Sequence, residues 1–255
     1  MNKRLFRIIG GIIFLLILMV AMIPIYDNYL LKQQDLNSPN LFTRYSDSGY
    51  YRIDPKTILA SLETGQIDVF TPLLENPNEI EPVTSTPIRW TQADFMKIVS
   101  ALGQFAWGDP MNLKDWSMYY ISFEGSCNDP MGFSFASFTY FKTRTTGYET
   151  RLIEIYPGYG WVRWGNSQTY PKPILQKWNK VDLLEAKVNA DNALQIASED
   201  AKKRFQFTKG CGVSMGTPQY NDPKNWYLDF TGAPDAIAYT VNLETGNYTF
   251  QNLSK

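Results

Sequence analysis

The hydrophobic pattern divides the chain into an apolar N-terminal run and a long mixed remainder. Residues 8–26 (IIGGIIFLLILMVAMIPIY) carry no charge. A helix of about nineteen residues is about 28 Å long, close to the hydrocarbon thickness of a bilayer. Lys3, Arg4 and Arg7 precede the run, and basic residues stay on the cytoplasmic side. Residues 1–27 are therefore predicted to be a cytoplasmic stub and a single-pass anchor in the cell membrane, with the body outside the cytoplasm.

A cleaved secretory signal is the alternative to an anchor. Its apolar core is shorter, and it ends in a small-residue cleavage site. The end of this run, Pro24-Ile25-Tyr26, offers no such site. An uncleaved membrane anchor is therefore the favoured interpretation.

Polar residues then give way to the first folded unit. Residues 28–50 have no apolar period and are predicted to be a tether. A short helix is expected after Asp54-Pro55, and four prolines make residues 71–88 an extended connector. Thr91 and Asp94 resemble a capping box, which predicts the start of a helix. The apolar residues that follow have helical spacing: Phe95, Ile98, Val99 and Leu102. Alternating aromatic segments predict strands at residues 117–124, 133–142, 148–156 and 161–164.

The second unit repeats this order after a boundary at Pro171-Lys172-Pro173. A strand is expected at residues 178–188, followed by a helix at residues 190–205 with a stripe of small residues. Further strands are predicted at residues 213–220, 226–230, 236–243 and 248–250. The fold class is therefore α+β, with two helix-plus-antiparallel-sheet units at residues 51–175 and 176–255. The first unit could be a distant copy of the second, although no residues repeat.

Composition narrows the chemistry. The chain has no histidine and a formal net charge of −1. The absence of histidine removes the commonest general base and excludes histidine-containing metal sites. The net charge near zero gives no reason to expect nucleic acid as a partner. We expect no metal and no cofactor, and an aromatic content of 15% favours strands with large side chains.

Cys127 and Cys211 are the two cysteines of the chain. In an oxidising compartment they are expected to form a disulfide. The bond would close a loop of about 85 residues and stabilise the fold by up to about 4–5 kcal/mol. The alternative is a pair of unbonded thiols.

The last quarter of the chain resembles a PepSY-type domain. The resemblance lies in the helix residues 192–197, the strand residues 226–230 that begin with Trp226, and the hairpin residues 239–248 with the pattern Y-x-V-x-L-x-T-G-x-Y. It implies a small extracytoplasmic domain that is often membrane-associated and is proposed to regulate peptidases or mediate local contacts. The family has no catalytic residues to transfer.

Aromatic side chains are the first candidate for ligand binding. Five of them lie close together in sequence: Tyr156, Tyr159, Trp161, Trp164 and Tyr170. If exposed, they could stack on sugar rings or hold a peptide. The alternative is that they pack a sheet face beneath the first helix.

Carboxylates are the second candidate, because a pair of them can perform acid–base chemistry without histidine. Glu124, Asp129, Glu154 and Asp229 lie near predicted strands. Strand alternation places Glu154 on the same face as Leu152 and Tyr156. The alternative for each carboxylate is a solvated or singly paired surface group.

Three functions follow in order of preference. The first is a non-enzymatic binding or regulatory module outside the cytoplasm, which presents a sheet surface or strand edge to a protein partner. The second is a glycan- or peptide-binding domain that uses the five aromatics, and exposed Trp161 and Trp164 would favour it. The third is a histidine-free hydrolase with a carboxylate pair.

Overall fold

The computed structural model describes residues 43–66, 68–84, 87–112, 115–129, 131–144, 147–169, 186–207, 210–217, 224–232 and 236–253. The predicted anchor at residues 8–26, most of the tether and the boundary at residues 171–173 lie outside these ranges. No helix within them is long and apolar enough to cross a membrane.

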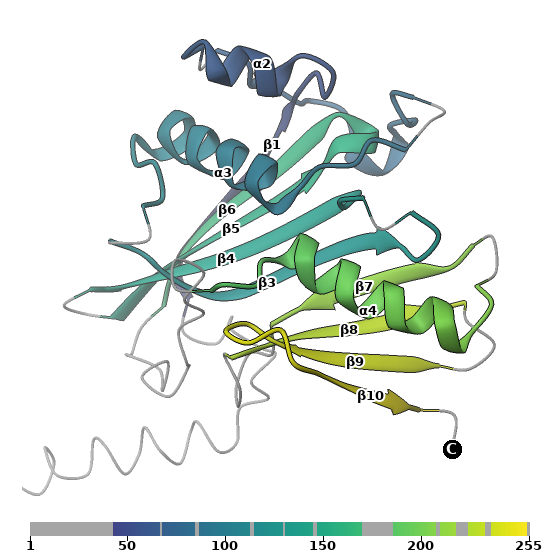
Figure 1. The fold of residues 1–255 in the computed structure, drawn as a ribbon. Coiled ribbons are helices and arrows are strands. Elements are labelled where there is room, and N and C mark those ends of the chain that lie inside the picture. The colour runs from purple at the N-terminus through teal and green to yellow at the C-terminus, as the bar shows by residue number, and fades with distance from the viewer. Residues whose placement is uncertain are drawn as a thin grey trace, which may run out of the picture.

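One antiparallel sheet of ten strands dominates the fold (Figure 1). The strands are β1 (Thr43–Arg52), β2 (Thr71–Pro72), β3 (Ser117–Ser126), β4 (Phe135–Arg144), β5 (Gly147–Tyr156), β6 (Trp161–Thr169), β7 (Gly212–Gly216), β8 (Asn225–Thr231), β9 (Ile237–Asn242) and β10 (Tyr248–Asn252). Their order in the sheet is β10-β9-β8-β7-β3-β4-β5-β6-β1-β2. The α+β class is confirmed, and the strands of the two units form one sheet.

Three α-helices are described: α2 (Ile58–Glu63), α3 (Gln92–Trp107) and α4 (Ala190–Arg204). The capping box that starts α3 is confirmed, because Thr91 and Asp94 exchange both hydrogen bonds. Gly108 ends this helix with φ of 63°. Two short 3₁₀ turns, Pro77–Glu79 and Pro157–Tyr159, lie in the connections.

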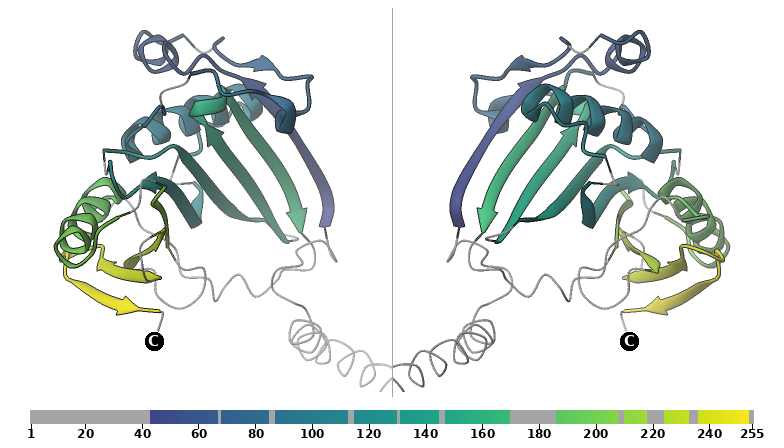
Figure 2. Two further views of the ribbon diagram at one scale, coloured as in Figure 1. Left: turned by 90° about the vertical axis from the view of Figure 1, so that its right-hand side faces the viewer. Right: turned by 90° about the vertical axis from the view of Figure 1, so that its left-hand side faces the viewer.

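Helices α3 and α4 cover the same face of the sheet (Figures 1 and 2). Phe95 of α3 packs against Phe123 of β3, with ring centroids 6.0 Å apart. Tyr239 of β9 donates a hydrogen bond to Asp200 of α4. Cross-strand pairing connects Phe123 and Tyr239 through β7 and β8, and directly opposed residues share a face. The hydrophobic core therefore lies between the two helices and one side of the sheet.

Each helix meets the sheet through the stripe that its sequence predicts. The apolar stripe of α3 is buried, as shown by Phe95, Ile98, Val99 and Leu102. The stripe of α4 is built mainly of alanine, and Ala190, Ala193, Ala197 and Ala201 have no exposed surface. Small side chains allow α4 to approach the strands closely.

The two units join where β3 pairs with β7. The ladder runs from Ser122 opposite Gly216 to Ser126 opposite Gly212. The next opposed pair is Cys127 and Cys211, which form a disulfide with a sequence separation of 84. The backbone N–H of Cys127 also donates to the carbonyl of Cys211 at 3.3 Å. The predicted disulfide is confirmed, and it fastens one end of this seam.

The N-termini of α3 and α4 meet above the seam. The first backbone N–H of α3, at Gln92, donates to Oδ2 of Asp191 at 3.0 Å. In return, the N–H of Ala190 donates to Oε1 of Gln92 at 2.7 Å. Both helices present the positive end of their dipole here, so a carboxylate between them is favourable. Burial nevertheless raises the pKa of Asp191, because it disfavours the charged form, and nearby Asp94 adds to the effect.

The layout of the two units is similar. A helix of 16 residues precedes β3–β6, and a helix of 15 residues precedes β7–β10. The first strands of the two sets pair antiparallel, so the sets extend in opposite directions from the seam. β1 and β2 are additions beyond the first set.

Strand β1 corrects the predicted tether. It begins at Thr43, inside the predicted tether of residues 28–50, and pairs with β6. Gly49 lies opposite Trp164, and a Cβ at Gly49 would stand 2.8 Å from the indole nitrogen. The sequence of β1 is polar and did not predict a strand. Its strand structure comes from pairing with β6. The expected strand at residues 178–188 is described only at residues 186–188, which are not in a strand.

We predict that the disulfide carries a measurable part of the stability. The double variant Cys127→Ala/Cys211→Ala should lose about 2–5 kcal/mol of unfolding free energy, because the unfolded chain gains the freedom of an open loop. Urea unfolding of the full-length protein, monitored by tryptophan fluorescence, measures this change in unfolding free energy. Reductant should destabilise the wild type and leave the double variant unchanged. A variant as stable as the oxidised wild type would contradict the prediction.

We also predict a pH dependence that Asp191 causes. Its pKa is raised in the folded state, so the folded protein holds this proton more tightly than the unfolded chain does. The contribution of Asp191 to stability is therefore greatest below the unfolded pKa of about 3.9 and declines as pH rises through the folded pKa. The stability of wild type minus that of Asp191→Asn should fall as pH rises from about 4. A difference that stays constant with pH would contradict this.

Candidate binding surface

The sheet has a second face, opposite α3 and α4, which we call the open face. One row of directly opposed residues crosses most of it: Arg52, Trp161, Tyr156, Glu124, Ser214, Asp229, Ala238 and Gln251. Phe135 of β4 lies opposite Glu124 and contacts Tyr156, so it belongs to the same row. The row changes character at the seam, from aromatic on β4–β6 to polar on β7–β10.

The aromatic half of the open face is a packed cluster of four rings, which we call the aromatic cluster: Tyr50, Phe135, Tyr156 and Trp161. The ring centroids of Tyr156 and Trp161 are 3.9 Å apart. Phe135 lies 4.6 Å from Tyr156, and Tyr50 lies edge-on to Trp161 at 5.6 Å. The cluster joins β1, β6, β5 and β4 on the side of the sheet away from the helices.

Charged residues border this cluster. Arg163 and Glu154 form an ion pair at 3.0 Å across β6 and β5. Burial raises the pKa of Tyr156 to about 12, and the negative charges of Glu154 and Glu124 contribute to the rise. The phenol of Tyr156 is therefore neutral at physiological pH. The indole N–H of Trp161 is buried without a hydrogen-bond partner.

The polar half of the open face is exposed to solvent. Ser214, Asp229, Thr249 and Gln251 are all exposed, and Tyr227 of β8 retains 37% of its surface. Strands β8 and β9 alternate between buried and less buried residues along their length. This pattern is typical of a sheet with one face on the core and one face in water.

The five predicted aromatic ligands do not form one surface. Tyr156 and Trp161 lie together in the aromatic cluster, but Trp161 is only 9% exposed. Tyr159 stands in the 3₁₀ turn between β5 and β6 and is 44% exposed. Trp164 points to the helix face, where it stacks on Tyr51 at 6.2 Å. Tyr170 lies outside the described residues.

The candidate carboxylates are likewise distributed. Glu154 shares the open face with Tyr156, as strand alternation predicts, and is paired with Arg163. Asp129 forms an ion pair with Arg89 at 3.2 Å. Glu124 and Asp229 project from β3 and β8, two strands apart on the open face. Within the described ranges, no group of three or more Asp, Glu, His or Cys side chains could hold a metal ion.

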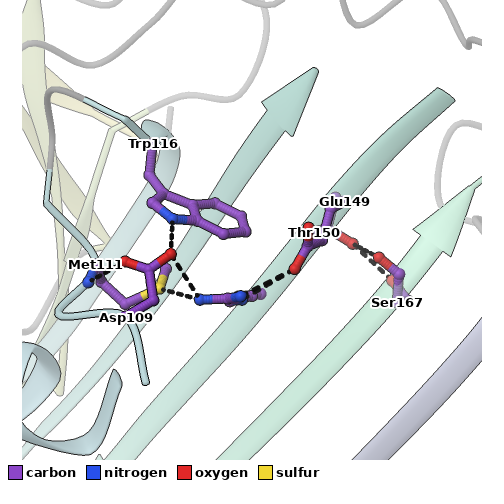
Figure 3. Close-up of polar contacts among 7 residues, drawn as sticks. Asp109, Met111, Trp116, Glu149, Thr150 and Ser167 are labelled. Carbon is purple, nitrogen blue, oxygen red and sulfur yellow. Dashed lines mark hydrogen bonds and ion pairs between the residues drawn. The ribbon is translucent and has the colours of Figure 1, made fainter. Parts of the chain in front are cut away.

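A buried arginine, Arg151, was not predicted; Figure 3 shows its partners Asp109 and Glu149. The guanidinium of Arg151 on β5 lies between the indoles of Trp107 and Trp116, at 4.5 and 4.2 Å from the ring centroids. It pairs with Glu149 at 3.0 Å and with Asp109 at 3.4 Å. These contacts attach the loop after α3 to the sheet.

Asp109 completes this arrangement. It accepts a hydrogen bond from the indole of Trp116 at 2.8 Å and another from the backbone N–H of Met111. Burial opposes ionisation, but these two hydrogen bonds and the charge of Arg151 together lower the pKa of Asp109. Because Arg151 is buried and pairs with carboxylates from both the loop and its own strand, the cluster is a structural element of the fold.

The two edges of the sheet differ. One ends in β2, which has two residues and includes Pro72. The other ends in β10, a regular strand of five residues that pairs with β9 without a register shift. Proline and short length are common protections of an edge strand. Only the β2 edge has them.

Tyr50, Phe135 and Arg151 were absent from the sequence-based candidates. Tyr50 was placed in the tether, and the strand partner of Phe135 could not be read from local pattern. Arg151 does sit at a core-facing position in the alternation of β5, together with Ile153 and Ile155, all three of which are buried. A charged residue at a core-facing position was the one sequence feature that could have indicated the Arg151 cluster.

Comparison with known proteins adds little. Neither a model of a known protein family nor a curated protein matches the chain. The PepSY resemblance therefore rests on residue pattern alone. Among solved structures, the chain is similar to a protein from Clostridium difficile 630 described as "a putative lipoprotein". The TM-score is 0.38 at 13% identity, over 67% of this chain and 98% of that one. A likeness of this degree does not bear on function.

We predict that Arg151 is essential to the fold. Arg151→Met should cost about 3–5 kcal/mol of unfolding free energy, because it removes the buried cation that pairs with both Asp109 and Glu149. The matched control is Arg163→Met on the open face, where the partly exposed ion pair should be worth about 1 kcal/mol or less. Urea unfolding of both variants measures the contrast, and equal losses would contradict it.

Proposed function

We propose that this protein is a membrane-anchored, extracytoplasmic binding module that acts on another protein without catalysing a reaction. The observation that carries the proposal is the uneven covering of the sheet. Helices α3 and α4 lie on one face, the polar half of the open face is exposed, and β10 ends the sheet with a regular strand. An exposed strand edge is a common site of protein recognition.

The proposed location rests on two features. The uncharged run of residues 8–26 follows three basic residues, which favours an anchor with the body outside the cytoplasm. The Cys127–Cys211 disulfide is typical of proteins in oxidising compartments. An exported peptidase or an envelope protein is the kind of partner that the PepSY resemblance favours.

The geometry supports the alternatives less well. A glycan-stacking surface needs exposed rings, whereas Trp161 is 9% exposed and Trp164 packs against Tyr51 on the helix face. A carboxylate hydrolase needs two carboxylates that converge on one substrate, whereas Glu154 and Asp129 are each ion-paired with an arginine, and Glu124 and Asp229 project from strands that β7 separates.

We predict export of the body. Alkaline phosphatase fused after Lys255 should be active in intact cells, because the enzyme requires an oxidising compartment to form its disulfides. Deletion of residues 8–26 from the same fusion should abolish the activity. An active deletion fusion, or an inactive full-length one, would contradict the proposed location.

We predict contact with a protein through the sheet. A photo-crosslinking amino acid is placed in the full-length chain at Asp229 on the open face, at Gln251 on β10, or at exposed Lys202 on α4 as control. Irradiation of intact cells should yield a discrete protein adduct from at least one sheet position and none from Lys202. Adducts from no position, or from all three equally, would contradict the proposed function.

A further inference from the structure

Strand β6 shows how this fold extends its sheet. β6 is the fourth strand of the first unit, and β1 pairs with it antiparallel from Thr43 opposite Thr169 to Arg52 opposite Trp161. β10 is the fourth strand of the second unit and occupies the equivalent place. In the part of the chain that the structure describes, no strand lies beyond β10. The edge that β1 covers in one unit is thus open in the other.

Hydrogen bonding shows which backbone groups of β10 face outward. The N–H of Asn242 donates to the carbonyl of Asn247, and the N–H of Leu253 donates to the carbonyl of Ala236. Hydrogen-bonded pairs alternate along an antiparallel ladder. Thr249 and Gln251 therefore bond to β9, while the N–H and C=O groups of Tyr248 and Phe250 point to the open edge.

The side chains at these two positions belong to the helix face. The hydroxyl of Tyr248 donates to Oδ1 of Asp200 at 3.0 Å. The ring of Phe250 packs against Phe205 at 5.7 Å and lies beneath the guanidinium of Arg204 at 4.9 Å. Tyr248 is 42% exposed, and Phe250 is partly buried. A strand added at this edge would therefore complete the border of an apolar layer.

Strand β1 carries an aromatic residue on the helix face, as β10 does. Tyr51 projects to the helix face and packs against Phe105 at 5.3 Å and Phe70 at 6.3 Å. The neighbouring Tyr50 projects to the open face. β10 itself contains no charged residue, no proline and no register shift, so it lacks the features that discourage strand addition.

We propose that β10 is the docking edge for an extended segment of a partner protein, which adds as an antiparallel strand in the way that β1 adds to β6. The segment bonds to the outward backbone groups of Tyr248 and Phe250. Its alternate side chains are apolar and pack beside these two rings on the helix face. This proposal rests on the proposed binding function and assigns it a surface and a mode.

A matched pair of variants tests the outward N–H of Phe250. Phe250→Ala and Phe250→Pro both remove the ring, but only proline also removes the N–H, and it does so on the side away from β9. The probe is a displayed library of ten-residue peptides with apolar residues at alternate positions, selected against the full-length protein in detergent micelles. Selected peptides should bind the alanine variant at least about tenfold more tightly than the proline variant, the equivalent of about 1.4 kcal/mol for the backbone contact.

Amide hydrogen exchange of the wild type provides a test that needs no variant. A bound peptide should slow exchange at Tyr248 and Phe250 more than at Thr249 and Gln251, whose amides already bond to β9. Equal affinity for both variants, or protection without this alternation, would overturn the proposal. Dimerisation of the wild type through β10, abolished by Phe250→Pro, would also overturn it in favour of a second copy. A failure here together with a protein adduct from Asp229 would leave the binding function in place and assign it to the open face.

Discussion

The pairing of β3 with β7 is the interaction on which the rest of the structure depends. It merges two helix-plus-sheet units into one antiparallel sheet, and the Cys127–Cys211 disulfide continues its register by one residue pair. Because α3 and α4 are each bound to their own strands, the same pairing brings the two helix N-termini together. Asp191 and Gln92 then satisfy backbone groups that would otherwise be buried without partners. The seam therefore determines both the continuity of the sheet and the side on which the core forms.

Because both helices lie on one face of the sheet, the open face has no helix from α3 or α4 over it. On the open face, β4–β6 and β1 gather the aromatic cluster, whereas β7–β10 present polar side chains to solvent. The aromatic half resembles a small secondary core that stiffens the first unit, since its rings contact one another across four strands. The polar half and the β10 edge remain available. The two halves of the open face therefore differ: one is filled by packed aromatic rings, and the other presents polar side chains to solvent.

Local patterns in the sequence predicted the elements well. The capping box at Thr91, the alanine stripe of α4 and the alternation in β5 identified three segments and their faces, because each depends on neighbours within a few residues. Strand β1 was missed for the opposite reason. Its polar sequence acquires strand structure from pairing with β6, more than a hundred residues away, and Gly49 makes sense only opposite the indole of Trp164. Arg151 was missed because its partners come from the loop after α3 as well as from its own strand.

The sequence by itself determined the α+β class, the positions of the main helices and of most strands, the two cysteines available for pairing, and the absence of histidine chemistry. These properties follow from composition and from periodicities of two or 3.6 residues, which act over short distances along the chain. Only the tertiary structure decided that the two units share one sheet, that Trp161 and Trp164 lie on opposite faces, and that β10 rather than β2 is the regular edge. Each of these depends on the register of strands that are distant in sequence, and cross-strand hydrogen bonding and packing set that register only when the whole chain has folded.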